Sequence, residues 1–293
     1  MNLSLAKISY RMPGIRLAGK AIPPAWFFRW TSVTTNLAAR SGLTRQSRLK
    51  YFRTVLASTH EPARLEELGR KHLLYRKWRD TIFLAWPCWA KRHNELTLVE
   101  GEENLKAALR EGRGAFLLSG HFYGFEPVVA PAMAQRGYRM HRTGFGWRGD
   151  DIAERWGKGS YARWQHINYG DDRRERLQAL AKIERALARN EVVHLSIRGF
   201  SQGDPQFEIP FCYGKFFLDG PLIEVVELLG APVIPCFALL DERGRFVIRL
   251  YPAEPPTGTE IMSGFGQLYA RYLRDHPEFA QIWKNVAQKR KEW

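Results

Sequence analysis

The chain has 293 residues, 45% of them hydrophobic, which suits one large domain or two small ones and excludes a disordered chain. The 45 Lys and Arg residues against 30 Asp and Glu give a formal net charge of +15, which favours an anionic partner. The three cysteines, Cys88, Cys212 and Cys236, form no paired motif, so we expect a reducing compartment and no structural zinc site.

The positive charge is concentrated at the start of the chain. Residues 1–60 carry ten Lys or Arg side chains and no Asp or Glu, together with the aromatic residues Trp26, Phe27, Phe28 and Trp30. A basic stretch with aromatic residues favours a membrane surface, an acidic protein or nucleic acid as partner. Two alternatives stay open: a solvated basic face whose aromatic residues pack inward, or an organellar transit peptide.

The apolar runs of the chain are short. None reaches the roughly 18 residues that a membrane-spanning helix needs. The N-terminus also lacks the continuous apolar core of a secretory signal peptide. We therefore expect a cytoplasmic protein that can lie peripherally on the inner face of the cytoplasmic membrane.

Residues 1–94 are predicted to be helical. Trp26, Trp30, Val33 and Leu37 recur at helical spacing, and residues 45–56 form a second, basic helix. A third helix opens at Pro62, which is a favourable first-turn residue. Its apolar stripe advances in steps of three and four residues through Leu65, Leu68, His72, Tyr75, Trp78, Ile82 and Trp86. On this stripe we expect His72 to be a packed histidine rather than a ligand.

Strands and helices alternate from residue 95 onward. Strands are predicted at residues 96–100, 115–119, 138–143, 192–197, 233–240 and 246–251. Helices are predicted at residues 103–111, 127–135, 173–189, 221–229 and 259–274. This alternation predicts an α/β fold, with a mainly parallel central sheet flanked by helices. We predict one domain over residues 1–293, with a helical extension (1–94) that faces a membrane or carrier, and an α/β core (95–293).

The sharpest chemical feature is the segment Gly-His-Phe-Tyr-Gly-Phe-Glu at residues 120–126. His121 directly follows a predicted buried strand, and sites in open α/β sheets form at the carboxyl ends of strands. Glu126 stands just before Pro127 opens a helix, where a carboxylate is favoured as the anion. A turn of this length can fold Glu126 back onto His121, so that the glutamate orients a general base. The alternative is a loop histidine followed by a helix cap.

Four further segments accompany the His121-x4-Glu126 motif. They are Gly-Glu-Glu-Asn-Leu at 101–105, Ile-Pro-Phe-Cys-Tyr-Gly at 209–214, Gly-Ala-Pro-Val-Ile-Pro at 230–235, and His276-Pro277-Glu278 followed by Trp283. In this order and at these separations, the set resembles the bacterial late acyltransferases of lipid A biosynthesis, within the lysophospholipid acyltransferase superfamily. The resemblance covers about residues 97–250, with a weaker similarity at the C-terminus.

The resemblance implies transfer of a fatty acyl chain from an acyl thioester, on acyl carrier protein or coenzyme A, to a hydroxyl or amine of a lipid or small-molecule acceptor. His121 and Glu126 would be the catalytic residues, with His121 deprotonating the acceptor. Arg163, where the family often has an arginine, or backbone N–H groups near Gly214 would stabilise the tetrahedral oxyanion. Pro210, Phe211, Tyr213 and Gly214 would help to bind the acceptor or acyl chain, or would simply form a strand-to-loop corner. No metal and no cofactor are implied.

The sequence departs from the family pattern in two places. Where the family often reads His-Phe-Gly-Asn-Trp-Glu, this chain has Tyr123, Gly124 and Phe125 in the middle of the motif. Where many members carry Asp-Gln-Asp after a strand, residues 196–198 are Ser-Ile-Arg. Arg198 would then meet an anionic head group, or be a surface residue. The acceptor therefore stays open, as do the acyl chain length, the carrier and the oligomeric state.

Other functional classes have weaker support. Residues 144–149 match the dinucleotide-binding pattern G-x-G-x-x-G, but the strand predicted before them is polar, so a glycine loop is favoured. A serine hydrolase is disfavoured because the chain has no G-x-S-x-G elbow. The non-enzyme alternative is a basic membrane-surface or nucleic-acid binding protein. We expect no nucleic-acid partner, since no recognised nucleic-acid binding motif is present.

Overall fold

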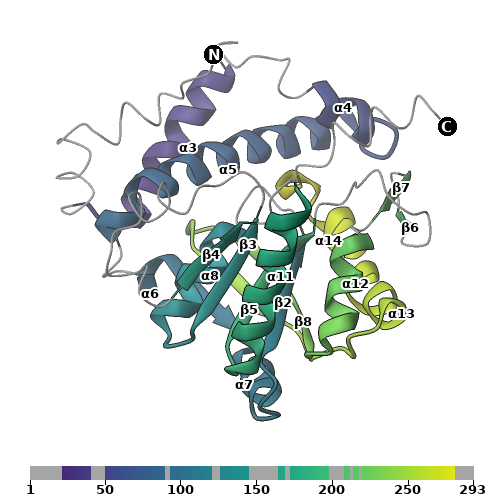
Figure 1. The fold of residues 1–293 in the computed structure, drawn as a ribbon. Helices are drawn as coiled ribbons and strands as arrows, with labels where there is room; N and C mark the ends of the chain where they lie inside the picture. Colours follow the sequence, from purple (N-terminus) through teal and green to yellow (C-terminus); the bar gives the residue numbers. More distant parts are fainter. Residues whose placement is uncertain are drawn as a thin grey trace.

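A mostly parallel sheet forms the centre of the molecule (Figure 1). The structure is a computed structural model that describes residues 22–40, 50–89, 93–120, 126–144, 164–168, 172–197, 208–211, 214–217 and 220–280. In that part of the chain the sheet has seven strands in the order β1-β9-β8-β2-β5-β3-β4. Their bounds are β1 (Thr97–Glu100), β2 (Ala115–Gly120), β3 (Met140–Gly144), β4 (Trp164–Asn168), β5 (Val192–Ile197), β8 (Val233–Leu240) and β9 (Phe246–Leu250).

Five neighbouring strands share one direction. β8, β2, β5, β3 and β4 are paired in parallel, whereas β9 runs antiparallel to β8, and β1 is parallel to β9. The predicted α/β class with a mainly parallel sheet is therefore confirmed. The reversal at β9 follows from the short turn after β8, because a chain that turns back within a few residues can only pair antiparallel.

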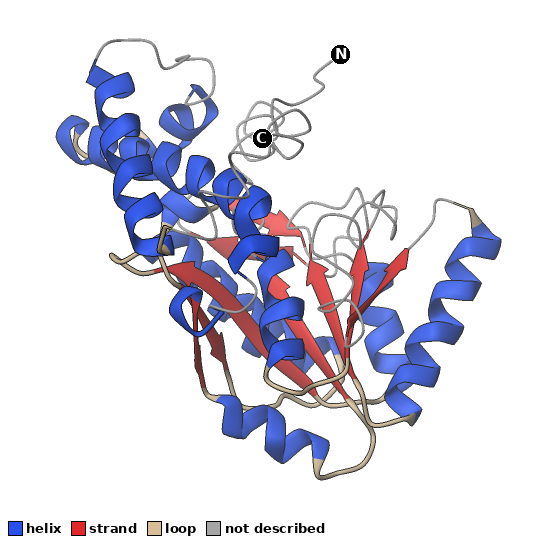
Figure 2. Cartoon of the chain, turned by 90° about the vertical axis from the view of Figure 1, so that its left-hand side faces the viewer, coloured by secondary structure: helices blue, strands red, loops and turns tan. Residues whose placement is uncertain are grey.

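The helices of the core cover both faces of the sheet, as Figure 2 shows. They are α7 (Glu102–Leu109), α8 (Glu126–Gln135), α11 (Arg173–Ala188), α12 (Gly220–Leu229), α13 (Gly258–Ile261) and α14 (Gln267–Asp275). A π-helical turn, η4 (Met262–Gly266), joins α13 to α14, and a 3₁₀ turn, η5 (Pro277–Phe279), follows α14. Because both faces are covered, the central strands β2 and β8 are rich in apolar residues, and all six residues of β2 and all eight of β8 are buried.

A helical layer lies across one end of the sheet, formed by α3 (Pro24–Arg40), α4 (Lys50–Leu56) and α5 (Pro62–Trp89) (Figure 1). A short helix, α6 (His93–Leu96), leads into β1. The prediction for His72 is confirmed: the ring is buried, and Nδ1 lies 2.9 Å from the backbone oxygen of Glu278. No helix among the described residues is both long and apolar enough to cross a membrane.

The turn between β8 and β9 joins this layer to the sheet. The indole Nε1 of Trp78, on α5, donates to the carbonyl oxygen of Gly244 at 2.9 Å. Phe28, on α3, packs edge-on against Trp78 with ring centroids 5.2 Å apart, and it also lies over Gly244. β8 runs parallel to β2, so its end lies at the edge of the sheet where β2 ends. The helical layer is thus attached to the carboxyl edge of the parallel strands.

The aromatic residues of α3 divide between two environments. Phe28 is 8% exposed, whereas Trp26 and Trp30 are 65% and 69% exposed. The alternative in which the aromatic residues of the basic segment all pack inward is therefore wrong for the two tryptophans.

Candidate functional site

Two of the predicted site residues, His121 and Arg198, directly follow strands that end at the carboxyl edge of the sheet. β2 ends at Gly120, immediately before His121, and β5 ends at Ile197, immediately before Arg198. Gly120 and Ile197 are aligned partners in the parallel pairing of the two strands. The next residues, 121–125 and 198–207, lie outside the described residues. The backbone therefore brings the starts of these two segments to neighbouring places at the edge where α/β sheets carry their sites.

The proposed general-base pair is described only in part. Glu126 is the first residue of α8, as expected for a residue that opens a helix, but its side chain and His121 lie outside what the structure describes. The hydrogen bond between them stays a prediction. Tyr213, Arg163 and Arg198 also lie outside the described residues.

The neighbour of Arg163 is placed at the opposite edge. β4 begins at Trp164, which is aligned with Met140, and Met140 is in turn aligned with Val192 at the start of β5. Val192 marks the amino edge of the sheet, whereas Gly120 marks the carboxyl edge. Arg163 itself lies outside the described residues, so its role in stabilising the oxyanion stays a prediction.

The predicted substrate-binding segment forms a hairpin. β6 (Glu208–Phe211) pairs antiparallel with β7 (Gly214–Phe217), with Phe211 aligned to Gly214 and Pro210 to Lys215. Gly214 has a φ of 135°, in the region that favours glycine. The sequence pattern does not predict this hairpin, because each strand has only four residues and β6 contains a proline.

One helical segment links the hairpin to the end of β2. A Cβ atom on Gly120 would meet the Tyr269 ring at 2.5 Å, and one on Gly266 would meet Cδ1 of Ile209 at 2.3 Å. The fully buried Tyr269 therefore packs on the residue before His121, while the nearby Gly266 packs on β6. The segment η4–α14 thus bridges the two regions that the sequence singled out.

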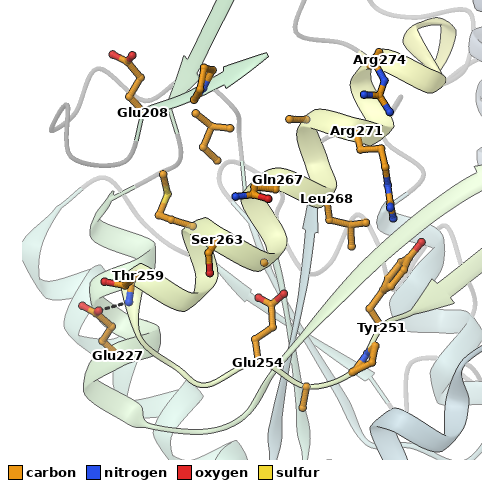
Figure 3. Close-up of a pocket in the computed structure, with 18 of the residues that line it drawn as sticks. Glu208, Glu227, Tyr251, Glu254, Thr259, Ser263, Gln267, Leu268, Arg271 and Arg274 are labelled. Carbon is orange, nitrogen blue, oxygen red and sulfur yellow. Dashed lines mark hydrogen bonds between the residues drawn. The ribbon is translucent and has the colours of Figure 1, made fainter. Parts of the chain in front are cut away.

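An open pocket of about 1580 Å³ lies beside this segment (Figure 3). Its walls come from β6, α12, η4 and α14, and from the chain that follows β9. The lining includes the carboxylates of Glu208, Glu224, Glu227 and Glu254, the guanidinium groups of Arg271 and Arg274, and the apolar Ile209, Pro210, Met262 and Leu268. Of the residues predicted to bind substrate, Pro210 is the one placed in this lining. The sequence pattern does not reveal this pocket, because its lining is spread over residues 208–274 and only the fold brings these elements together.

Glu254 is the most perturbed acid of the pocket lining. One carboxylate oxygen accepts a hydrogen bond from the backbone N–H of Phe265 at 3.1 Å, and the carboxylate fills the space where Gly264 lacks a side chain. Burial raises the pKa of Glu254 to about 7, although the Phe265 N–H opposes the rise. A carboxylate with this pKa is suited to proton exchange near neutral pH. It lies against a π-helical turn, a geometry that recurs at functional sites.

A second histidine lies close to the candidate site. Nε2 of His194, on β5, is 2.9 Å from Oγ of Ser119, which precedes His121 by two residues. Thr143 Oγ1 donates to the backbone oxygen of His194 at 3.3 Å. His194 is fully buried, so no substrate can reach it in this conformation. Its pairing with Ser119 holds β2 against β5 just below the carboxyl edge.

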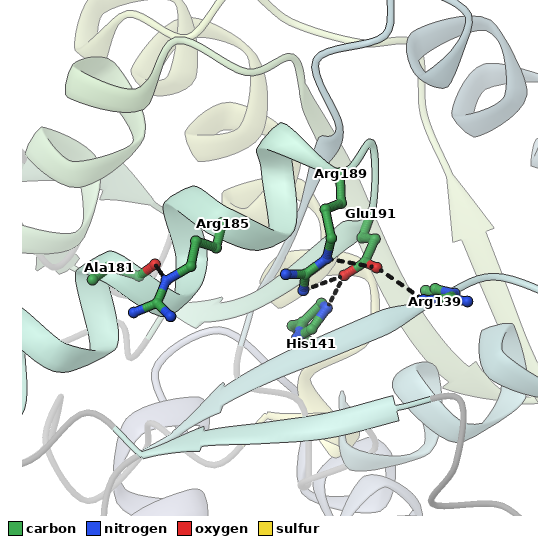
Figure 4. A network of polar contacts seen from close by, with 6 residues as sticks. All are labelled: Arg139, His141, Ala181, Arg185, Arg189 and Glu191. Atoms are coloured by element: carbon green, nitrogen blue, oxygen red, sulfur yellow. Dashed lines mark hydrogen bonds and ion pairs between the residues drawn. The ribbon is translucent and has the colours of Figure 1, made fainter.

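A histidine–glutamate pair occurs at the other edge of the sheet (Figure 4). Nε2 of His141 lies 2.5 Å from the Glu191 carboxylate, which also pairs with Arg189 and Arg139 at 2.9 and 3.5 Å. Burial opposes ionisation of Glu191, but the hydrogen bonds from Arg189 and His141 outweigh it and lower the pKa of Glu191. Glu191 precedes β5, so this pair lies far from Gly120 and ties β3 to β5. Because 50 residues separate its members, no local motif reveals it.

Several segments that carried the family resemblance have structural roles. Gly101 has a φ of 76°, and a Cβ there would lie 2.0 Å from the Leu250 carbonyl oxygen. Nδ2 of Asn104 donates to that same oxygen at 2.9 Å, which ties α7 to β9. The segment Pro277–Phe279 packs on α5, where Phe279 stacks on Tyr75 with ring centroids 4.3 Å apart. These contacts give Gly101 and Asn104 a structural role in the fold.

Two further kinds of side chain bear on the chemistry of the described residues: possible metal ligands and cysteine thiols. No three or more His, Cys, Asp or Glu side chains are arranged there to hold a metal ion. Cys236 is fully buried, and burial raises the pKa of its thiol, so it is not an accessible nucleophile.

Comparison with known proteins gives no assignment: no protein-family model and no curated protein matches this chain.

Proposed function

We propose that the protein transfers a fatty acyl chain from an acyl thioester, carried by acyl carrier protein or coenzyme A, to a hydroxyl or amine of a lipid or small-molecule acceptor. The observation that carries this proposal is the position of the His-x4-Glu motif. It begins one residue after the buried central strand β2, at the carboxyl edge of a mostly parallel sheet, and it ends at the first residue of α8.

In the proposed reaction His121 removes the proton from the acceptor as the acceptor attacks the thioester carbonyl. Glu126 orients the imidazole and stabilises its protonated form. The tetrahedral intermediate then collapses, the carbon–sulfur bond breaks, and His121 returns the proton to the departing thiolate. The products are the acylated acceptor and the free thiol of the carrier, so no covalent acyl-enzyme is needed.

The pocket beside η4–α14 supports this proposal because it offers a site where substrate can bind. It is large enough for part of a lipid, since small-molecule sites commonly occupy about 300–1,000 Å³. It combines apolar residues with charged groups of both signs, which suits a ligand with an acyl chain and a polar head. One of its walls is the segment η4–α14, whose Tyr269 packs on Gly120, so ligand binding there would be coupled to the end of β2.

The experiment is an acyl-transfer assay on the purified full chain. Long-chain acyl thioesters are supplied with a panel of lipid and small-molecule acceptors, and products are followed by mass spectrometry. We expect His121→Ala to abolish turnover and Glu126→Ala to reduce it by about 100-fold or more, since positioned general bases commonly contribute 10²–10⁴-fold.

His60→Ala is the matched control, because His60 is partly exposed between α4 and α5, outside the proposed site, and its loss should leave turnover unchanged. Circular dichroism must show that all variants keep the fold. Full activity in His121→Ala would contradict the mechanism. Absence of any transfer by the wild-type chain across the panel would favour the alternative, a non-catalytic basic binding protein.

A further inference from the structure

α3 exposes a continuous apolar stripe to solvent. Trp26, Trp30, Val33 and Leu37 are 65%, 69%, 52% and 60% exposed, and Ile22, just before the helix, is 40% exposed. The steps of three and four residues place Trp26, Trp30, Val33 and Leu37 on one side of the helix. The other large exposed apolar residues of the described chain, Leu98, Leu177 and Leu228, lie apart from one another on β1, α11 and α12.

The opposite side of α3 is fixed to the body of the molecule. Phe28, Thr31 and Thr35 are all buried, at steps of three and four residues. Phe28 packs on Trp78 of α5, and α3 lies along α5 in Figure 1. The helix is therefore held with its apolar stripe outward.

The charge around the stripe indicates what covers it. α3 contains Arg29 and Arg40 and no acidic residue, within a segment of 60 residues that has ten Lys or Arg and no Asp or Glu. A helix with exposed tryptophans and basic flanks suits the boundary of an anionic bilayer, where indole rings prefer the head-group level and cations meet lipid phosphates. An acidic protein partner would satisfy the charge, but the tryptophan side of the helix would then need an apolar partner surface as well.

The stripe also lies on the side of the molecule that holds the candidate site. Phe28 contacts Gly244 in the turn after β8, at the carboxyl edge where β2 ends at Gly120. In Figure 1 the helical layer covers this end of the sheet, opposite α7.

We propose that α3 docks flat on an anionic phospholipid bilayer, with Trp26 and Trp30 inserted at the head-group level and Val33 and Leu37 continuing the contact. The docked helix turns the carboxyl edge of the sheet, and with it the start of the His-x4-Glu segment, toward the membrane. The membrane contact does not depend on acyl transfer, so an experiment can contradict either proposal without contradicting the other.

The test is vesicle flotation of the full-length protein with two lipid compositions. One set of vesicles is pure phosphatidylcholine, and the other also contains phosphatidylglycerol. We expect the protein to float with the anionic vesicles, and to do so less as the salt concentration rises, because surface charges are screened. Trp26→Ser combined with Trp30→Ser should reduce binding by about tenfold or more, since interfacial binding scales with the apolar area inserted.

Leu177→Ser combined with Leu228→Ser is the matched control. It removes two exposed apolar side chains from α11 and α12, which lie away from α3, and should leave flotation unchanged. Circular dichroism and the thermal midpoint establish that both double variants are folded. The proposal is overturned if the tryptophan variant floats as well as wild type, or if wild type binds neither vesicle.

Sedimentation velocity tests the other occupant, a second copy of the chain. If wild type is a dimer, the tryptophan variant is a monomer, and vesicle binding is the same for both, then the stripe is a dimer interface and the proposal is wrong.

Discussion

At the scale of single residues, Gly120 is tightly packed one position before His121. Gly120→Ala would place a Cβ 2.5–2.8 Å from three carbon atoms of the buried Tyr269 ring. The ring or the strand end must then move, so we expect a loss of about 1–3 kcal/mol in the free energy of unfolding, which urea denaturation measures. Acyl transfer should fall at the same time, because the shift occurs one residue before His121.

A double-mutant cycle tests whether the loss of stability in Gly120→Ala comes from the contact with the Tyr269 ring. In Gly120→Ala combined with Tyr269→Leu, the smaller side chain leaves room for the new methyl group. The combined loss of stability should therefore be smaller than the sum of the two single losses. Simple additivity would mean that the ring is not what Gly120 accommodates.

Glu254 makes stability depend on pH. Its pKa is raised from 4.5 to about 7 in the folded protein, so the folded state holds a proton that the unfolded state releases between these values. Ionisation of Glu254 thus costs no stability below about pH 4.5, and its full cost is present above about pH 7. Glu254→Gln removes this cost, so its thermal midpoint relative to wild type should rise between pH 4.5 and pH 8. A constant difference across this range would contradict the raised pKa.

At the scale of elements, the joint between the helical layer and the sheet depends on Trp78. Its indole is fully buried and donates to Gly244 in the β8–β9 turn. Trp78→Phe leaves that carbonyl oxygen without its donor and opens a cavity, so we expect a loss of about 2–4 kcal/mol in the free energy of unfolding. Trp30→Phe makes the same chemical change at an exposed position and should cost less than about 0.5 kcal/mol. Equal losses would show that Trp78 has no special role.

The elements that could be predicted from sequence are those with a long or strong pattern. The apolar runs of β2, β5 and β8 and the periodic α5 and α11 were predicted within a few residues, because burial on both faces or on one stripe leaves a clear signature. β4 was missed, since Trp-Gln-His-Ile-Asn alternates poorly, and so was the β6–β7 hairpin. The helix predicted over 259–274 was correct in place, but its π-helical turn at Met262–Gly266 was not predicted. That turn contacts the carboxylate of Glu254, which lies outside the helix and so outside its periodic pattern.

The candidate site was predictable only in its position along the chain. A histidine after a buried strand pointed to the carboxyl edge of the sheet, and the described backbone places Gly120 there. The strand order could not be predicted from the sequence, and it is this order that puts Ile197 beside Gly120. The register of β4 places Trp164 at the amino edge of the sheet. The pocket depends on contacts between β6, α12 and α14, which only the folded chain brings together.

At the scale of the whole molecule, the helical extension and the α/β core share one hydrophobic core. Phe52 and Trp78 from the extension belong to the same buried cluster as Phe116 and Phe237 of the sheet. Phe52 packs on His72, and Nδ1 of His72 lies 2.9 Å from the backbone oxygen of Glu278 near the end of the described chain. Neither part can separate without exposing apolar surface of the other, which costs about 25 cal/mol per Å².

We therefore expect the extension and the core to unfold in one cooperative step, as one domain over residues 1–293 would. Far-UV circular dichroism follows all helices and strands, while hydrogen exchange of α3 and of β2 follows each part separately. In urea these three probes should give a single midpoint, and Trp78→Phe should lower that midpoint equally for all of them. If α3 exchanges at a lower urea concentration than β2 in the wild-type protein, the extension is an independent unit, and its membrane contact would then be made by a part that can open away from the sheet.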